Sequence, residues 1–306
     1  MKKILVLSIL SGLLFVSISL ADSDSILEKA RIEFGEQHFK KAARLYKSAI
    51  DSGAVSMNNY YNAACCMANS DDIDGAFVYL NKAIDSGYKY ADWLEKDMDL
   101  WPLHQDPRWK ETFARCQKLY DTYLKTINMP LYLLFRADQS DRAGVYVGDE
   151  KNEIAHRDSL RREKVTVMIS KNELKVSDDY YHAALIYQHG LDSLDYKLAN
   201  QLANKAVELD STNENARWLV AASQDRYLWS IGQPQWYGMQ LHKLAGKWTL
   251  EPIDTTKVTD KDRRFLCVPS LKVKRQQIKE MNTQSSSPVP LFDDDDESTP
   301  ELLDDN

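Results

Sequence analysis

The sequence predicts an all-α protein whose N-terminal part is built from helical repeats. The pentapeptide at residues 49–53 recurs letter for letter at residues 83–87, a spacing of 34 residues. Small residues keep the same register, as Ala42 and Ala76 show. Units of this length are helix–turn–helix hairpins that stack, because no single hairpin buries its own apolar face. Residues 247–253 are the exception, because their pattern predicts a short strand or an extended arm.

The two repeat units supply the first four predicted helices. Apolar residues at helical spacing predict helices over residues 25–34 and 39–50 in the first unit. The second unit repeats this pattern over residues 60–67 and 73–83, with a turn at the acidic pair Asp71 and Asp72. The glycine that ends each repeated pentapeptide, Gly53 or Gly87, follows the second helix of its unit, where we expect a left-handed C-cap.

The repeats resemble the tetratricopeptide (TPR) family. The resemblance is carried by the 34-residue period and by the small–aromatic–small positions Ala42, Tyr46 and Ala49 of the second helix. It implies a short TPR-like solenoid over residues 22–128, with a concave surface that receives a protein or peptide partner.

The array closes after two units. Pro102 and Pro107 exclude a continuous helix across this stretch. The D-P-R-W string at residues 106–109 resembles the segment that ends many bacterial TPR arrays, and it predicts a capping helix over residues 109–127. We expect the tryptophans of this segment to seal the end of the array; they are Trp93, Trp101 and Trp109.

Both chain ends are predicted to lie outside the folded body. Lys2 and Lys3 precede an apolar run, and Ser19-Leu20-Ala21 fits a signal-peptidase site, so residues 1–21 are predicted to be a signal peptide and the protein to be periplasmic or extracellular. The alternative is an uncleaved anchor, because the run is close to the lower limit of roughly 17–25 residues for a membrane span. No later segment has a transmembrane length.

The C-terminal segment, residues 283–306, is expected to be a disordered acidic tail. It holds eight acidic side chains and no basic one, within a total net charge of −7. A solvating tail is the favoured interpretation, and binding to a basic partner or to cations is the alternative. Without the tail the body is close to neutral, so nucleic acid is not an expected partner.

Residues 129–282 predict a second, mainly helical domain. Helices are expected over residues 131–142, 154–172, 179–189, 196–209 and 213–231, and a last basic helix over residues 260–281. The β-branched run at residues 165–169 leaves the second of these helices open. The four cysteines show no CxxC pattern; Cys65 and Cys66 are expected to be buried thiols, and the pairing of Cys116 and Cys267 stays open.

This region resembles a bacterial family of unknown function. The most specific string is P-Q-x-Y-G-x-Q at residues 234–240, and further matches are the Q-H-G string at residues 188–190, the D-R pair at residues 225–226 and the acidic–arginine stretch from Asp138 to Arg142. Met239 departs from the family, whose members commonly carry threonine there. The resemblance names a domain, and it implies no activity.

Polar residues of this region form the candidate site. His182 and His189 are seven residues apart, so they are expected to share one helix face. One interpretation is a pocket with a histidine general base or a small ligand; the other, which we favour, is a structural hydrogen-bond network. The full set of candidates is His182, Gln188, His189, Asp225, Arg226, Gln235, Tyr237, Gln240 and His242.

No motif for a known reaction, cofactor or metal is present in the sequence. The spacing of His182 and His189 is not a standard ligand spacing, and there is no H-E-x-x-H, G-x-S-x-G or Walker motif. We therefore expect no metal and no cofactor. The leading functional hypothesis is an exported interaction scaffold that is not an enzyme, and the alternative is an enzyme or small-ligand receptor that uses the polar residues between 180 and 242.

Overall fold

The protein is all-α, as the sequence predicts. The computed structural model describes residues 23, 25–142 and 150–283. The predicted signal peptide and the acidic tail beyond Thr283 lie outside these residues. A two-stranded sheet is the one sheet found in the described part of the chain. None of the described helices is both long enough and apolar enough to cross a membrane.

The two repeat units form the predicted helical hairpins. Residues 25–35 and α2 (Phe39–Asp51) make the first, and α3 (Met57–Ala68) and α4 (Ile73–Asp85) make the second. The alanines expected at the tight helix–helix contacts have no exposed surface, which lets the helix backbones approach closely. These residues are Ala30, Ala42, Ala49, Ala64, Ala76 and Ala83.

The turns between these helices follow the predicted chemistry. Gly53 and Gly87 have φ values of 104° and 102°, a left-handed conformation that glycine adopts without the cost a Cβ would add. This confirms the expected C-caps. Asp72 caps α4 by accepting the backbone N–H of Gly75 through its carboxylate, at 3.0 Å.

The segment after the second unit is broken by its prolines. It contains α5 (Ala91–Leu94), the 3₁₀ helix η1 (Met98–Leu103) and α6 (Arg108–Leu124). The expectation that its tryptophans seal the array is wrong for two of them, because Trp93 and Trp101 are 60% and 55% exposed. Trp109 does pack inward, between the rings of His104 and Phe113.

The second region begins with five helices. They are α7 (Met129–Arg142), α8 (Glu150–Ser170), α9 (Ser177–Gln188), α10 (Ser193–Leu209) and α11 (Glu214–Ser230). The β-branched run at residues 165–169 is helical and lies within α8. Its first residue is fully buried in the core, so tertiary packing outweighs the lower helix propensity of β-branched residues here.

The chain ends in a hairpin and two helices. Strands β1 (His242–Leu244) and β2 (Lys247–Thr249) pair antiparallel. β2 lies within residues 247–253, the segment expected to be extended, and β1 lies just before it. The single basic helix expected over residues 260–281 is instead two helices, α12 (Asp260–Phe265) and α13 (Leu271–Thr283). Pro269 lies between them, and Cys267 has a φ of 58°, so the backbone leaves the helical conformation before α13 begins.

The protein has two main hydrophobic cores, one formed by residues before residue 128 and one by residues after it. One contains buried residues between Leu27 and Cys116, and the other contains buried residues between Leu131 and Val268. A small third cluster at residues 123–132 joins them. All four cysteines are free thiols; Cys65, Cys66 and Cys116 are buried, which confirms the expectation for the adjacent pair.

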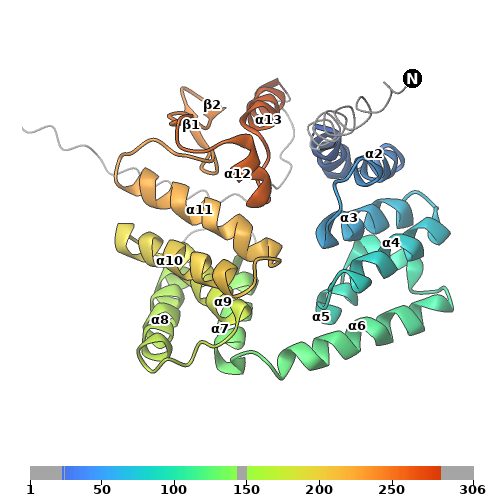
Figure 1. Ribbon diagram of the computed structural model, residues 1–306, viewed down its shortest axis with the longest axis horizontal. Helices are drawn as coiled ribbons and strands as arrows, with labels where there is room; N and C mark the ends of the chain where they lie inside the picture. The colour runs from blue at the N-terminus through green and yellow to red at the C-terminus, as the bar shows by residue number, and fades with distance from the viewer. Residues whose placement is uncertain (1–22, 24, 143–149, 284–306) are drawn as a thin grey trace, which may run out of the picture.

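The two halves face each other across the molecule. Figure 1 shows the repeat hairpins on one side, α7–α13 on the other, and α6 running along one edge toward α7. Side chains bridge the halves: Asn58 of α3 donates to Glu214 of α11 at 3.0 Å, and Glu28 contacts Gln277 of α13. Part of the array's inner side is therefore covered by the second region of the same chain.

Candidate functional site

The nine predicted site residues come from α9, α11 and the segment that leads into β1. Most are buried, and Asp225 and Gln235 have no exposed surface. Their contacts nevertheless divide them into separate groups. The members are His182, Gln188 and His189 at α9, Asp225 and Arg226 in α11, and Gln235, Tyr237, Gln240 and His242 after it.

His182 belongs to the junction between the halves. Its Nε2 lies 3.2 Å from the hydroxyl oxygen of Tyr123, and its ring stacks on Phe135 with the centroids 4.3 Å apart. Its Nδ1 is buried and has no hydrogen-bond partner among the described residues. Burial lowers the pKa of His182 to about 4, because a charged imidazolium loses its hydration there. This side chain is a neutral member of an aromatic cluster.

His189 also faces α7, where it pairs with Asp138 rather than with the aromatic residues that contact His182. The Nδ1 atom of His189 lies 3.0 Å from Oδ2 and 3.3 Å from Oδ1 of Asp138. Asp138 is fully buried and also accepts hydrogen bonds from Arg142 at 3.0 Å and Gln139 at 2.8 Å. Burial alone would raise the pKa of Asp138, but the hydrogen bond and charge of His189 and the charge of Arg142 together lower it.

The C-terminal end of α9 is held by three other helices. Arg226 of α11 donates to the carbonyl oxygen of Gln188 at 2.8 Å, and Arg162 of α8 donates to that of His189 at 3.2 Å. The hydroxyl of Tyr196 in α10 donates to the carbonyl oxygen of Gly190 at 3.0 Å. Cations at the last carbonyls of a helix satisfy free acceptors and oppose the negative end of its dipole.

Asp225 organises the loop that carries the P-Q-x-Y-G-x-Q string. Its carboxylate accepts the backbone N–H groups of Trp236 at 2.8 Å, Tyr237 at 3.0 Å and Met239 at 2.8 Å. Burial raises the pKa of Asp225 even though these three donors favour its charged form. The bond at residue 239 uses the backbone N–H, so it does not depend on the Met239 side chain.

The two glutamines of the string complete the same loop. Gln235 donates through Nε2 to the carbonyl oxygens of Gln240 and Leu250, both at 2.9 Å, and accepts the backbone N–H of Gln240 at 2.7 Å. Buried polar groups with every bond made fix one conformation. The side chains of Asp225 and Gln235 therefore serve the loop itself.

The remaining candidates are arranged around this loop. The guanidinium of Arg226 lies 3.4 Å from the side-chain oxygen of Gln240, so it links the loop to α9. The ring of His242 packs on Trp229 at a centroid distance of 4.6 Å, and burial lowers its pKa. The hydrogen bonds of His182 and His189 go to Tyr123 and Asp138, and not to Asp225 or Gln235 of the predicted set. Asp138 is not among the nine predicted site residues, although it lies in the acidic–arginine stretch at residues 138–142.

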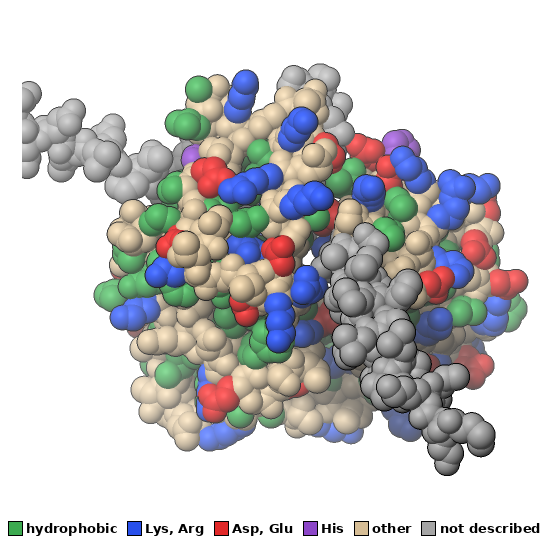
Figure 2. Space-filling model, turned by 45° about the horizontal axis from the view of Figure 1, so that its top comes forward, with side chains coloured by type: hydrophobic (Ala, Val, Ile, Leu, Met, Phe, Trp, Pro, Cys, Tyr) green, Lys and Arg blue, Asp and Glu red, His purple; other side chains and the backbone are tan. Residues whose placement is uncertain are grey.

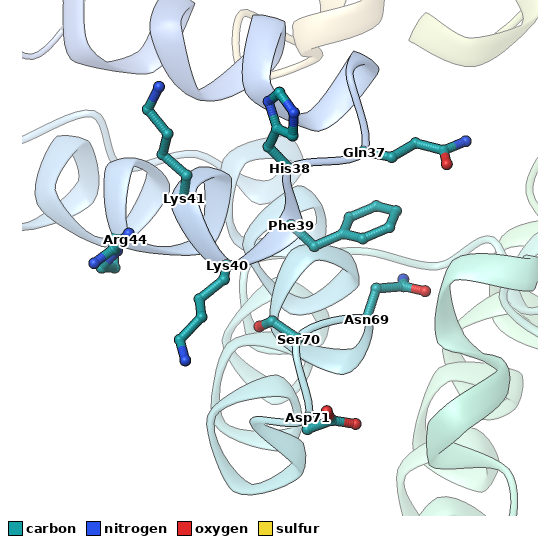
Figure 3. A pocket seen from close by; sticks show the side chains of 9 residues that line it. All are labelled: Gln37, His38, Phe39, Lys40, Lys41, Arg44, Asn69, Ser70 and Asp71. Carbon is teal, nitrogen blue, oxygen red and sulfur yellow. The ribbon is translucent and has the colours of Figure 1, made fainter.

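A separate concavity of about 650 Å³ lies on the array beside α2. Figure 3 shows Lys40, Lys41 and Arg44 extending from one side of α2, and Phe39 from the other. Figure 2 shows basic and acidic side chains mixed over this part of the surface. Glu33, Glu36 and His38 lie close enough to share a metal ion, but Lys41 already pairs with Glu33. This cluster is an exposed ion-pair group of mixed charge.

Comparison with protein-family models found no match to this chain, and comparisons with curated proteins and with solved structures also found none.

Proposed function

We propose that this protein is an exported helical-repeat scaffold that binds a protein or peptide partner on its TPR-like array. One observation carries the proposal: the segment from α5 to η1 exposes three large apolar side chains. Trp93 is 60% exposed, Met98 is 70% exposed and Trp101 is 55% exposed. Single exposed apolar residues are ordinary, but two tryptophans and a methionine within nine residues form a set that is enriched in protein interfaces.

The surroundings of Trp93 fit a partner at the concave side of the array. Trp93 follows Tyr90 by three residues, and the hydroxyl oxygen of Tyr90 lies 3.3 Å from the side-chain nitrogen of Asn215 in α11. The second region thus covers the inner side up to Tyr90, and Trp93 lies about one turn beyond this contact. A peptide bound along the remaining inner side would meet Trp93 at that border.

The experiment compares partner binding by the mature chain and by a Trp93→Ala, Trp101→Ala double variant. Peptides are selected from a displayed random library against the wild-type chain, and their dissociation constants are then measured for both proteins. We expect the double variant to bind at least about tenfold more weakly, because buried tryptophan anchors at interfaces contribute 2 kcal/mol or more.

A Leu191→Ala, Leu194→Ala variant is the matched control, because it removes two side chains that are 67% and 73% exposed in the second region. It should bind like the wild type. Equal affinity of the tryptophan variant and the wild type for every selected peptide would exclude this surface as the binding site.

A further inference from the structure

The pairing of Asp138 with His189 determines which ring nitrogen of His189 carries the proton. Asp138 accepts hydrogen bonds from the permanently charged guanidinium of Arg142 and from the side-chain amide of Gln139, so its carboxylate is ionised and only accepts hydrogen bonds. The Nδ1 atom of His189 must therefore be the donor in the 3.0 Å contact. The lone pair of the neutral ring is then on Nε2.

The Nε2 atom has no partner inside the described residues. The hydrogen bonds of the His189 side chain run from Nδ1 alone, to the two oxygens of Asp138. Nε2 is not fully buried, so it keeps contact with solvent. The His189 side chain as a whole is 9% exposed. An accessible lone pair on a ring held by a buried carboxylate is the arrangement of a general base.

A second, independent feature at the same helix end indicates a ligand that donates hydrogen bonds. Gln188 is 5% exposed, and its side-chain oxygen Oε1 is buried without a partner. Leaving a buried acceptor without a donor is costly, so native proteins normally supply a donor from protein, water or ligand. Gln188 and His189, at the C-terminal end of α9, thus each offer an acceptor that no described group uses.

The backbone at this end is fixed, as a positioned base requires. The carbonyl oxygens of residues 188–190 are held by Arg226, Arg162 and Tyr196, which come from three different helices. Gly190 lies so close to the side chain of Asp195 that there is no room for a Cβ at this position. Support from several rigid elements keeps a reacting group within the narrow range of positions that catalysis needs.

We propose that Asp138 and His189 form a proton-accepting dyad that binds a hydroxyl-bearing ligand or a water molecule. In the step it supports, the O–H bond breaks, its electron pair stays on the oxygen, and the proton binds to Nε2. Asp138 stabilises the imidazolium that results, and the oxygen is left as a nucleophile. This activity is separate from partner binding by the array.

The test measures how fast each histidine of the mature chain reacts with diethyl pyrocarbonate, with the sites resolved by mass spectrometry. The reagent adds an ethoxycarbonyl group to an accessible, unprotonated imidazole nitrogen and releases ethyl carbonate. We expect His189 to react at least about tenfold faster than His182, whose free nitrogen is buried. A rate for His189 as slow as that for His182 would overturn the proposal.

Two Asp→Asn variants in α7 show whether Asp138 supports the base. Asp138→Asn should slow the modification of His189 at least about tenfold, since hydrogen bonds to charged groups are strong enough for that factor. Asp141→Asn is the matched control, because Asp141 lies in the same helix and pairs with Arg157 and Arg161 of α8 instead of His189. It should leave the rate within about twofold. Equal rates in both variants would contradict a dyad.

Nitrogen-15 NMR of the wild-type chain tests the tautomer without any substitution, so the result does not depend on whether a variant folds. The proposal requires the proton of neutral His189 on Nδ1 and the lone pair on Nε2. A spectrum with the proton on Nε2 would refute the proposal, because that nitrogen could then accept nothing.

Discussion

His182 shows what burial does to a single titratable side chain. It is 2% exposed, is stacked against Phe135, and makes one hydrogen-bond contact, with Tyr123. Its pKa falls from 6.5 to about 4, so the folded protein resists binding a proton that the unfolded chain accepts. The stability that neutral His182 contributes is complete above pH 6.5, and it is lost as the pH falls from 6.5 to 4.

The pH dependence of unfolding measures this effect. Because each pKa unit corresponds to 1.36 kcal/mol, we expect the free energy of unfolding to lose about 3 kcal/mol through His182 between pH 6.5 and pH 4. A His182→Phe variant keeps an aromatic ring and removes the titration, so the wild type and the variant should differ by this amount across that interval. Urea unfolding at several pH values gives the two curves. Parallel curves would mean that His182 is hydrated in the native state.

At the scale of elements, local patterns were predictable and contacts between distant segments were not. The hairpins of the array, their buried alanines and the left-handed Gly53 follow from a repeat of 34 residues, which needs only local sequence. The pairing of Asp138 with His189 joins residues that are 51 apart. It depends on how α7 packs against α9, which helical periodicity does not specify. The exposure of Trp93 is not predictable from local sequence either, because it depends on how other elements pack around it.

The loop from residue 232 to residue 241 is an element held by one carboxylate. Asp225→Asn would place an amide N–H₂ or a weaker neutral acceptor where Asp225 now accepts three backbone N–H groups. We expect a loss of about 3 kcal/mol in the free energy of unfolding, because buried donors lose a charged acceptor. Asp254→Asn is the control, because Asp254 also accepts a backbone N–H, from Thr256, but this hydrogen bond is exposed. Its loss in urea unfolding should be clearly smaller, and equal losses would show that burial of Asp225 is unimportant.

At the scale of the whole molecule, the two halves form a partly closed arrangement in which few side chains hold them together. The junction cluster at residues 123–132 and the contact between Glu28 and Gln277 lie at different places along the interface. Between them, Lys89 of the array pairs with Asp178 at the start of α9, with 2.7 Å between the nitrogen and oxygen atoms. Interfaces of this kind between domains leave relative motion possible unless such pairs restrain it.

The strength of that restraint is measurable by a double-mutant cycle on Lys89 and Asp178. Their side chains are 28% and 14% exposed, and the Lys89 nitrogen also lies 4.2 Å from the ring centroid of Tyr123. We expect a coupling free energy of about 1 kcal/mol or more, since partial burial reduces screening by water and the aromatic ring adds attraction. Lys47 and Asp51 are the matched control, with the same 2.7 Å distance but side chains that are 58% and 59% exposed. Their coupling should stay below about 0.5 kcal/mol. If both cycles gave the same small value, Lys89 and Asp178 would contribute no more than a surface pair, and the restraint would have to come from the apolar junction and the other contacts between the halves.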